Sequence, residues 1–92
     1  MLWRAHANLR LAWRLVTERL PALSPRDMVR TLERAGLRVV REGRRHTVMW
    51  REGLPRPVPV PRHVRGLKRS LMRAIIKEAG LTVGQFVEHL GR

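Results

Sequence analysis

The sequence predicts a small α+β domain in which three antiparallel strands are covered on one face by two helices. Three observations predict this fold. Two capped helix signals lie near residues 24–36 and 67–80, three short strand signals lie between them, and 92 residues provide one modest core. The domain is expected to span residues 21–92, with a short C-terminal helix at its end and a helical extension at residues 1–20.

The extension, residues 1–20, has the pattern of a basic amphipathic helix. Apolar residues recur at helical spacing from Leu9 to Leu20, and four arginines accompany a single glutamate. This pattern is typical of a membrane-surface helix, an organelle transit segment or a helix that docks on the domain or on a partner. A further interpretation is that translation begins near Leu20, so that residues 1–19 are not native sequence.

The first helix of the domain is marked at both ends. Ser24–Asp27 combines an N-cap serine, a proline at the first helical position and an acidic residue at the capping-box position. Met28 and Leu32 then recur on one face together with Ala35, and Gly36 ends the helix.

Alternating residue types predict two strands, 37–42 and 45–50, joined by a turn at Gly43-Arg44. In the second strand His46, Val48 and Trp50 share one face. If Val48 packs inward, His46 lies at the inner rim of the sheet. Prolines at alternate positions limit the third strand, within 56–61, to a short or edge strand whose valines face the core.

The second long helix is expected from Leu67 to Ala79. One of its faces is apolar except for a single glutamate and consists of Leu67, Leu71, Ala74, Ile75 and Glu78. A row of like charges at steps of four follows another face: Arg65, Arg69, Arg73 and Lys77. Like charges at this spacing repel each other, so the pattern favours a bound polyanion over a merely solvated face. A last helix, capped by Thr82 and Gln85, is expected to place Phe86 and Leu90 on the core.

Composition narrows the possible functions. Twenty basic residues against 7 acidic ones give a net charge of +13, which indicates nucleic acid or an acidic protein as partner. The chain has no cysteine, which excludes disulfides, thiolate nucleophiles and thiolate metal sites. No apolar run approaches the roughly 20 residues that cross a bilayer. A soluble protein of the cytoplasm is expected.

One stretch, Arg41–Trp50, carries the chemistry. It sets His46, an imidazole that exchanges protons readily near neutral pH, among Arg41, Arg44 and Arg45, whose guanidinium groups fit phosphate oxygens. The sequence offers no cluster of carboxylates suited to magnesium. We therefore expect a reaction on a phosphodiester without metal or cofactor; the alternative is an exposed strand histidine beside solvated arginines.

The predicted order of elements is also the layout of double-stranded-RNA-binding domains, which read RNA by shape and phosphates. Within that order, four short patterns follow one another: Leu32–Leu37, Val39-Val40-Arg41, Val60-Pro61-Arg62-His63, and Leu67-Lys68 with Ile75 and Ala79-Gly80-Leu81. Through these patterns, Ser24 to Val87 resembles the HicA toxins of toxin–antitoxin pairs. Family members commonly start just before the first helix, which Leu20-Pro21-Ala22 matches.

The resemblance implies an mRNA interferase: His46 aligns with the family's catalytic histidine and cleaves RNA, and a HicB-like antitoxin neutralises the toxin. The residues expected to bind RNA are Arg41, Arg44, Arg45, His63, Arg65, Lys68, Arg69, Arg73 and Lys77. For His63, a role in positioning the second helix is the alternative. The family's Gly-Ser before the histidine is replaced by Arg44-Arg45, so a non-catalytic RNA-binding module or an inactive toxin is the second hypothesis.

Overall fold

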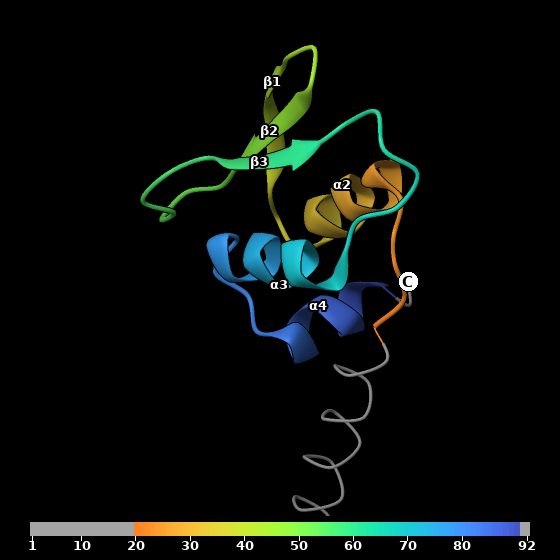
Figure 1. The fold of residues 1–92 in the computed structure, drawn as a ribbon. Helices are drawn as coiled ribbons and strands as arrows, with labels where there is room; N and C mark the ends of the chain where they lie inside the picture. The colour runs from red at the N-terminus through yellow and green to blue at the C-terminus, as the bar shows by residue number, and fades with distance from the viewer. Residues whose placement is uncertain (1–19, 91–92) are drawn as a thin grey trace, which may run out of the picture.

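A computed structural model of the chain describes residues 20–90. Its elements are α2 (Pro25–Arg34), β1 (Arg38–Glu42), β2 (His46–Trp50), β3 (Val58–Pro61), α3 (Arg69–Glu78) and α4 (Val83–Leu90). The strands form one antiparallel sheet in the order β1-β2-β3. Helices α2 and α3 lie under one face of this sheet, and α4 packs beneath them (Figure 1). The predicted α+β fold and element order are confirmed; the interpretations of residues 1–19 concern positions outside the described range.

Helix α2 forms where the capping signals predict it. The Ser24 hydroxyl accepts a hydrogen bond of 3.1 Å from the backbone N–H of Asp27, and Pro25 takes the first helical position. Met28 and Leu32 are fully buried. The burial of Met28 and Leu32 confirms the predicted apolar face of α2.

The sheet packs on the helices through the face that carries Met49. Met49 pairs with Val39 on one side and with Val58 on the other, so one apolar row crosses all three strands. Val48 pairs instead with Arg41 and Pro59 and is only half-buried. Since successive strand residues point to opposite faces, Val48 and His46 lie on the open face. The inner-rim position of His46, expected if Val48 packs inward, is therefore wrong.

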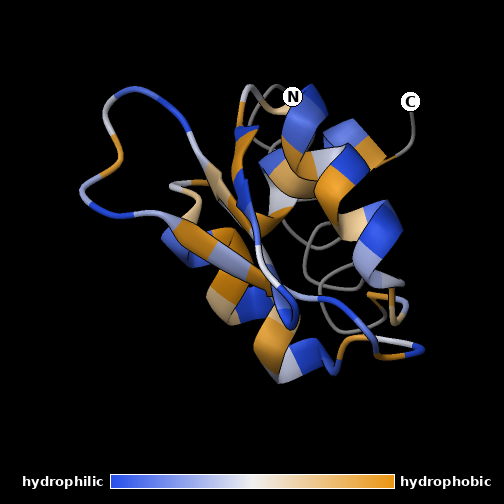
Figure 2. Cartoon of the chain, turned by 90° about the horizontal axis from the view of Figure 1, so that it is seen from above, coloured by the Kyte–Doolittle hydropathy of each residue, from blue (hydrophilic) through white to orange (hydrophobic). Residues whose placement is uncertain are grey.

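The third strand is short, as its prolines predict, and Val58 and Val60 are completely buried. Seen from above in Figure 2, orange and blue segments alternate along the helices, as expected for helices with one buried face. The buried side chains of the strands, such as Met49 and Val58, and of the helices, such as Met28 and Ile75, form one core.

Helix α3 begins later and presents a different face than the sequence predicts. It starts at Arg69, after an extended N-cap residue, Lys68, so the buried Leu67 lies outside the helix. Of the predicted face, Leu67 and Ile75 are buried, whereas Leu71, Ala74 and Glu78 are exposed, because the helical period applies only to the backbone from Arg69 onward. Leu71 is 39% exposed, and the core side chains are Met72, Ile75, Ile76 and Ala79.

The C-terminal helix α4 is capped as predicted. The N–H of Thr82 donates to Gln85 Oε1 at 2.9 Å, and the N–H of Gln85 donates to Thr82 Oγ1 at 3.1 Å. Phe86 is fully buried and Leu90 packs against the core. Over residues 20–90, none of the helices has the length and apolar character to cross a membrane.

Candidate active site

His46 is the first residue of β2, exposed on the open face of the sheet, and its register partner on β3 is Pro61. The residues after Pro61 turn past the N-terminal end of α2 (Figure 1). Both segments border one depression of about 400 Å³, lined by Arg45, His46, Pro61, Arg62, His63 and Val64. The fold therefore brings together the two histidines that the sequence analysis singled out, although 17 positions separate them in the chain.

Hydrogen bonds from Arg62 stabilise the turn that leads into His46. The N–H of Gly43 donates to the carbonyl of His46 at 2.8 Å, which closes the turn between β1 and β2. The backbone N–H of Arg62 donates to the carbonyl of Arg45 at 2.8 Å, and its Nη1 donates to the carbonyl of Gly43 at 2.6 Å. Hydrogen bonds from a charged donor are stronger than neutral ones. Arg62 thus fixes the backbone that carries Arg44, Arg45 and His46.

A β-bulge places Arg41 on the same face as His46. Strand β1 pairs Val39 with Met49 and Arg41 with Val48, which leaves Val40 as an extra residue. Without this extra residue, Arg41 would share the buried face with Val39, because strand side chains alternate. Bulges commonly re-aim a side chain near a functional site.

The charge at this end of the sheet is strongly positive. Arg41, Arg44 and Arg45 are all exposed, and Arg62 is partly buried behind them. Guanidinium groups donate in a planar fork that matches two phosphate oxygens. Of these three exposed arginines, Arg45 lines the depression together with His46, whereas Arg41 and Arg44 lie outside its lining, on β1 and in the adjoining turn.

The basic row of the second helix lies apart from this depression. Because α3 starts at Arg69, Arg65 belongs to the preceding loop, and only Arg69, Arg73 and Lys77 follow the helical spacing. All three side chains are exposed, and Arg69 Nε donates to the carbonyl of Leu20 at 2.8 Å. Neither they nor Lys68 line the depression at His46. The predicted RNA-binding residues thus fall into two separate groups.

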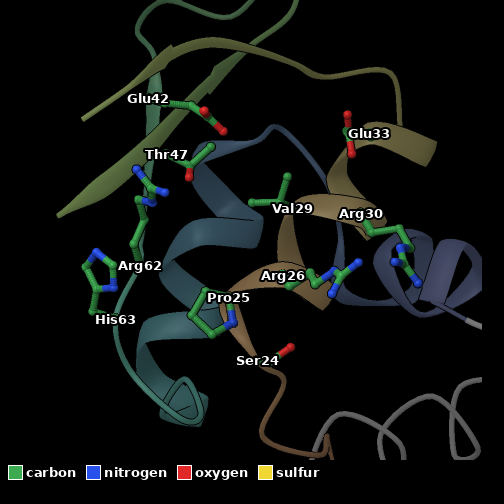
Figure 3. Close-up of a pocket in the computed structure, with 10 residues that line it drawn as sticks. All are labelled: Ser24, Pro25, Arg26, Val29, Arg30, Glu33, Glu42, Thr47, Arg62 and His63. Carbon is green, nitrogen blue, oxygen red and sulfur yellow. The ribbon is translucent and has the colours of Figure 1, made fainter. Parts of the chain in front are cut away.

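A second depression, of about 500 Å³, lies on the other side of the Arg62–His63 segment. One wall is the side of α2 that carries residues 25 to 33, and the other is formed by Glu42 of β1 and Thr47 of β2 (Figure 3). Sequence reasoning assigned no role to Arg62, Glu42 or Thr47. Arg62 belongs to the Val60–His63 motif, but only the fold shows that its side chain reaches Gly43.

Between Leu20 and Leu90, no three His, Asp or Glu side chains are grouped so that they could hold a metal ion.

Comparison with known proteins bears on this site. A family model described as the HicA toxin of bacterial toxin–antitoxin matches residues 25–81, more than half of the chain, and this span includes every residue of both depressions except Ser24. No curated protein and no solved structure matched the chain. Because the matched family consists of toxins from toxin–antitoxin pairs, the match also implies that this chain has a cognate antitoxin as its partner. The chain belongs to the HicA family of bacterial toxins.

Proposed function

We propose that this toxin is an endoribonuclease that cleaves mRNA in the bacterial cytoplasm, with His46 as its catalytic residue and without a metal ion or cofactor. The observation that carries the proposal is the depression in which His46 and His63 meet Arg45 and Arg62. It combines groups that transfer protons with groups that neutralise phosphate charge, which are the two requirements of RNA cleavage by general acid–base catalysis.

The proposed reaction uses the 2′-hydroxyl of the RNA as the nucleophile. His46 takes the proton of that hydroxyl, or protonates the leaving 5′-oxygen, and His63 is the second imidazole at the depression for the other transfer. A bond forms between O2′ and phosphorus while the bond from phosphorus to O5′ breaks. The products are a 2′,3′-cyclic phosphate and a 5′-hydroxyl. Arg41, Arg44 and Arg45 stabilise the charge that develops on the phosphate.

The second basic group is proposed to hold the RNA away from the cleaved bond. It comprises Arg65, Lys68, Arg69, Arg73 and Lys77, in the loop before α3 and along that helix. Contacts between such side chains and phosphates supply affinity without sequence preference. Under this proposal, substitutions on α3 weaken RNA binding and leave the rate of the bound complex unchanged.

The antitoxin is proposed to be HicB-like and to cover the His46 end of the sheet. The exposed arginines there favour a partner with acidic side chains, since complementary charge accelerates association and fixes orientation. Such an inhibitor would exclude RNA by occupying the same cationic surface.

The test is controlled expression of the full chain in a bacterial host, wild type beside His46→Ala, with growth and total mRNA integrity as readouts. His89→Ala on α4 is the matched control, because it also removes one imidazole but lies away from the depression. We expect growth arrest with mRNA fragmentation in the wild type and the control, and neither in His46→Ala. Fragmentation that persists in soluble His46→Ala would refute the catalytic role.

A second candidate function is a non-catalytic RNA-binding module. The observation that favours it is the exposed Arg44-Arg45 pair in the turn before His46, where the family has small residues. This candidate predicts that purified protein binds duplex RNA in a salt-sensitive manner and yields no fragments, with or without EDTA. His46-dependent fragments formed in EDTA would support the nuclease instead.

A further inference from the structure

The larger depression adjoins the candidate active site. Arg62 and His63 line both depressions, so one segment of chain separates them. A volume of about 500 Å³ lies within the range of small-molecule sites in proteins. An RNA strand whose reacting phosphate lies at His46 therefore has a neighbouring nucleotide within reach of the larger depression.

The two walls of the larger depression differ in chemistry. On the α2 side, Pro25 and Val29 present apolar surface, and Arg26, Arg30 and Glu33 are the charged side chains around it (Figure 3). On the sheet side, the carboxylate of Glu42 and the side chain of Thr47 face that apolar wall, and Arg62 lies beside them. A planar ring with a polar edge fits this arrangement, with one face against Val29 and its edge toward the carboxylate.

Arg26, Arg30 and Arg62 give the depression cations as well as carboxylates, so it is the sheet side, where Glu42 lies, that favours a base. A carboxylate only accepts hydrogen bonds, and it repels a phosphate. In this basic protein, Glu42 thus stands where a phosphate site would have a cation. Adenine, cytosine and guanine each carry an exocyclic amino group that donates to a carboxylate, whereas uracil flanks its single ring N–H with two carbonyl oxygens. Arg26 and Arg30 on α2 remain for the neighbouring phosphates.

We infer that the larger depression is a nucleobase subsite, in which Glu42 selects an amino-bearing base next to the cleaved bond. The inference rests on the proposed RNA cleavage and adds to it a sequence preference against uracil at one position. Thr47 is 6% exposed and sits opposite Glu42 in the strand register, so the sheet holds both polar groups at one level.

The test uses the purified full chain and a pool of single-stranded RNA with random sequence, and fragment ends are sequenced. We expect the wild type to disfavour uracil at one position beside the cut by about tenfold, the size of one base contact. Glu42→Gln, which offers a donor as well as an acceptor, is expected to remove most of that bias. The control Glu52→Gln makes the same charge change in the loop after β2, at the opposite end of the sheet, and is expected to keep the bias. An unchanged bias in folded Glu42→Gln would overturn the inference.

A binding measurement separates this inference from the proposed cleavage. If the wild type yields no fragments, the nuclease proposal fails, and the subsite is decided by titrating labelled full chain with cytidine or uridine monophosphate. We expect cytidine monophosphate to shift the amide signals of Glu42 and Thr47 and to bind several-fold more tightly than uridine monophosphate. Equal affinities, or shifts confined to other residues, would overturn the subsite.

Discussion

The two ends of β2 use the same residue types but differ in what those residues contact. At the Trp50 end, Arg38 and Arg51 contact other groups of the protein. The guanidinium carbon of Arg38 lies 5.2 Å from the centre of the Trp50 ring, and Arg51 Nη2 donates to the carbonyl of Ala79 at 3.5 Å. The indole Nε1 of Trp50 donates to the carbonyl of Leu54 at 3.0 Å. These contacts close the loop between β2 and β3 onto the domain.

At the His46 end, only Arg62 is anchored in this way, and it orders the turn that presents the other arginines. Arg41, Arg44 and Arg45 remain exposed beside an imidazole. The number of arginines in a segment therefore does not distinguish a candidate site from a structural contact. What distinguishes the His46 end is exposed guanidinium groups on an ordered backbone next to an exposed imidazole.

The largest expected effect is that of His46→Ala. Removing a general acid or base typically lowers the rate by about 10²- to 10⁴-fold. Because His46 is exposed, the free energy of unfolding should change by less than about 0.5 kcal/mol. Single-turnover cleavage of a short RNA and urea unfolding measure the two quantities. A large loss of stability would mean that the His46 end is structural, like the Trp50 end.

Arg62→Met should give the next largest effect. Methionine keeps an apolar stem but removes the donor to Gly43, so the turn loses a charge-assisted hydrogen bond of about 1.5 kcal/mol or more. We expect roughly a tenfold lower cleavage rate, since 1.4 kcal/mol corresponds to a factor of ten. Hydrogen exchange of the Gly43 amide should quicken at the same time. A lower rate with unchanged exchange would show that Arg62 acts on the RNA rather than through the turn.

Gly80→Ala should damage the Trp50 end and spare catalysis. Gly80 has φ of +75°, and an added Cβ would lie 2.8 Å from Arg51 Nη2. The left-handed backbone costs a residue with a side chain about 1–2 kcal/mol. We expect a loss of stability of that size in urea unfolding, with normal cleavage below the unfolding transition. Gly66→Ala is the control, because its Cβ would meet only Ala22 Cβ at 3.6 Å. Impaired cleavage by folded Gly80→Ala would break the contrast between the two ends.

The smallest effect is expected from Arg44→Gln. Losing one exposed cation should weaken RNA binding a few-fold and lower the slope of log Kd against log salt by about 0.7. Arg56→Gln, an equally exposed arginine in the loop after β2, should leave the slope unchanged. Fluorescence anisotropy with a labelled RNA at several salt concentrations measures both. If Arg44→Gln and Arg56→Gln gave the same slope of log Kd against log salt, RNA would not bind preferentially at the His46 end of β2.

Local signals predicted most of the fold. The caps at Ser24 and Thr82, and the proline-limited third strand, depend on neighbours in sequence, and each was confirmed. The buried face of α3 could not be predicted because Leu67, although buried, precedes the helix, which starts only at Arg69. The face of β2 that is buried depends on the pairing of Met49 with Val39 and Val58 on the two neighbouring strands. The sequence of β2 alone does not show this pairing.

The candidate site was predicted in part. The sequence indicated His46 and the arginines near it, and motif resemblance indicated His63. Their meeting in one depression depends on the pairing of β2 with β3, which brings Pro61 opposite His46. The contact from Arg62 to Gly43 joins positions 19 residues apart and has no signature in sequence. The bulge at Val40, which turns Arg41 outward, is equally invisible before the strands are paired.

The most direct test of the central claim is a chemical-shift titration of the labelled full chain with a short RNA that carries 2′-deoxy sugars and therefore resists cleavage. We expect the largest shifts in residues 43–47 and 61–64, at the His46 end of the sheet. Shifts centred on residues 50–57, or confined to residues 69–77 of α3, would contradict the central claim.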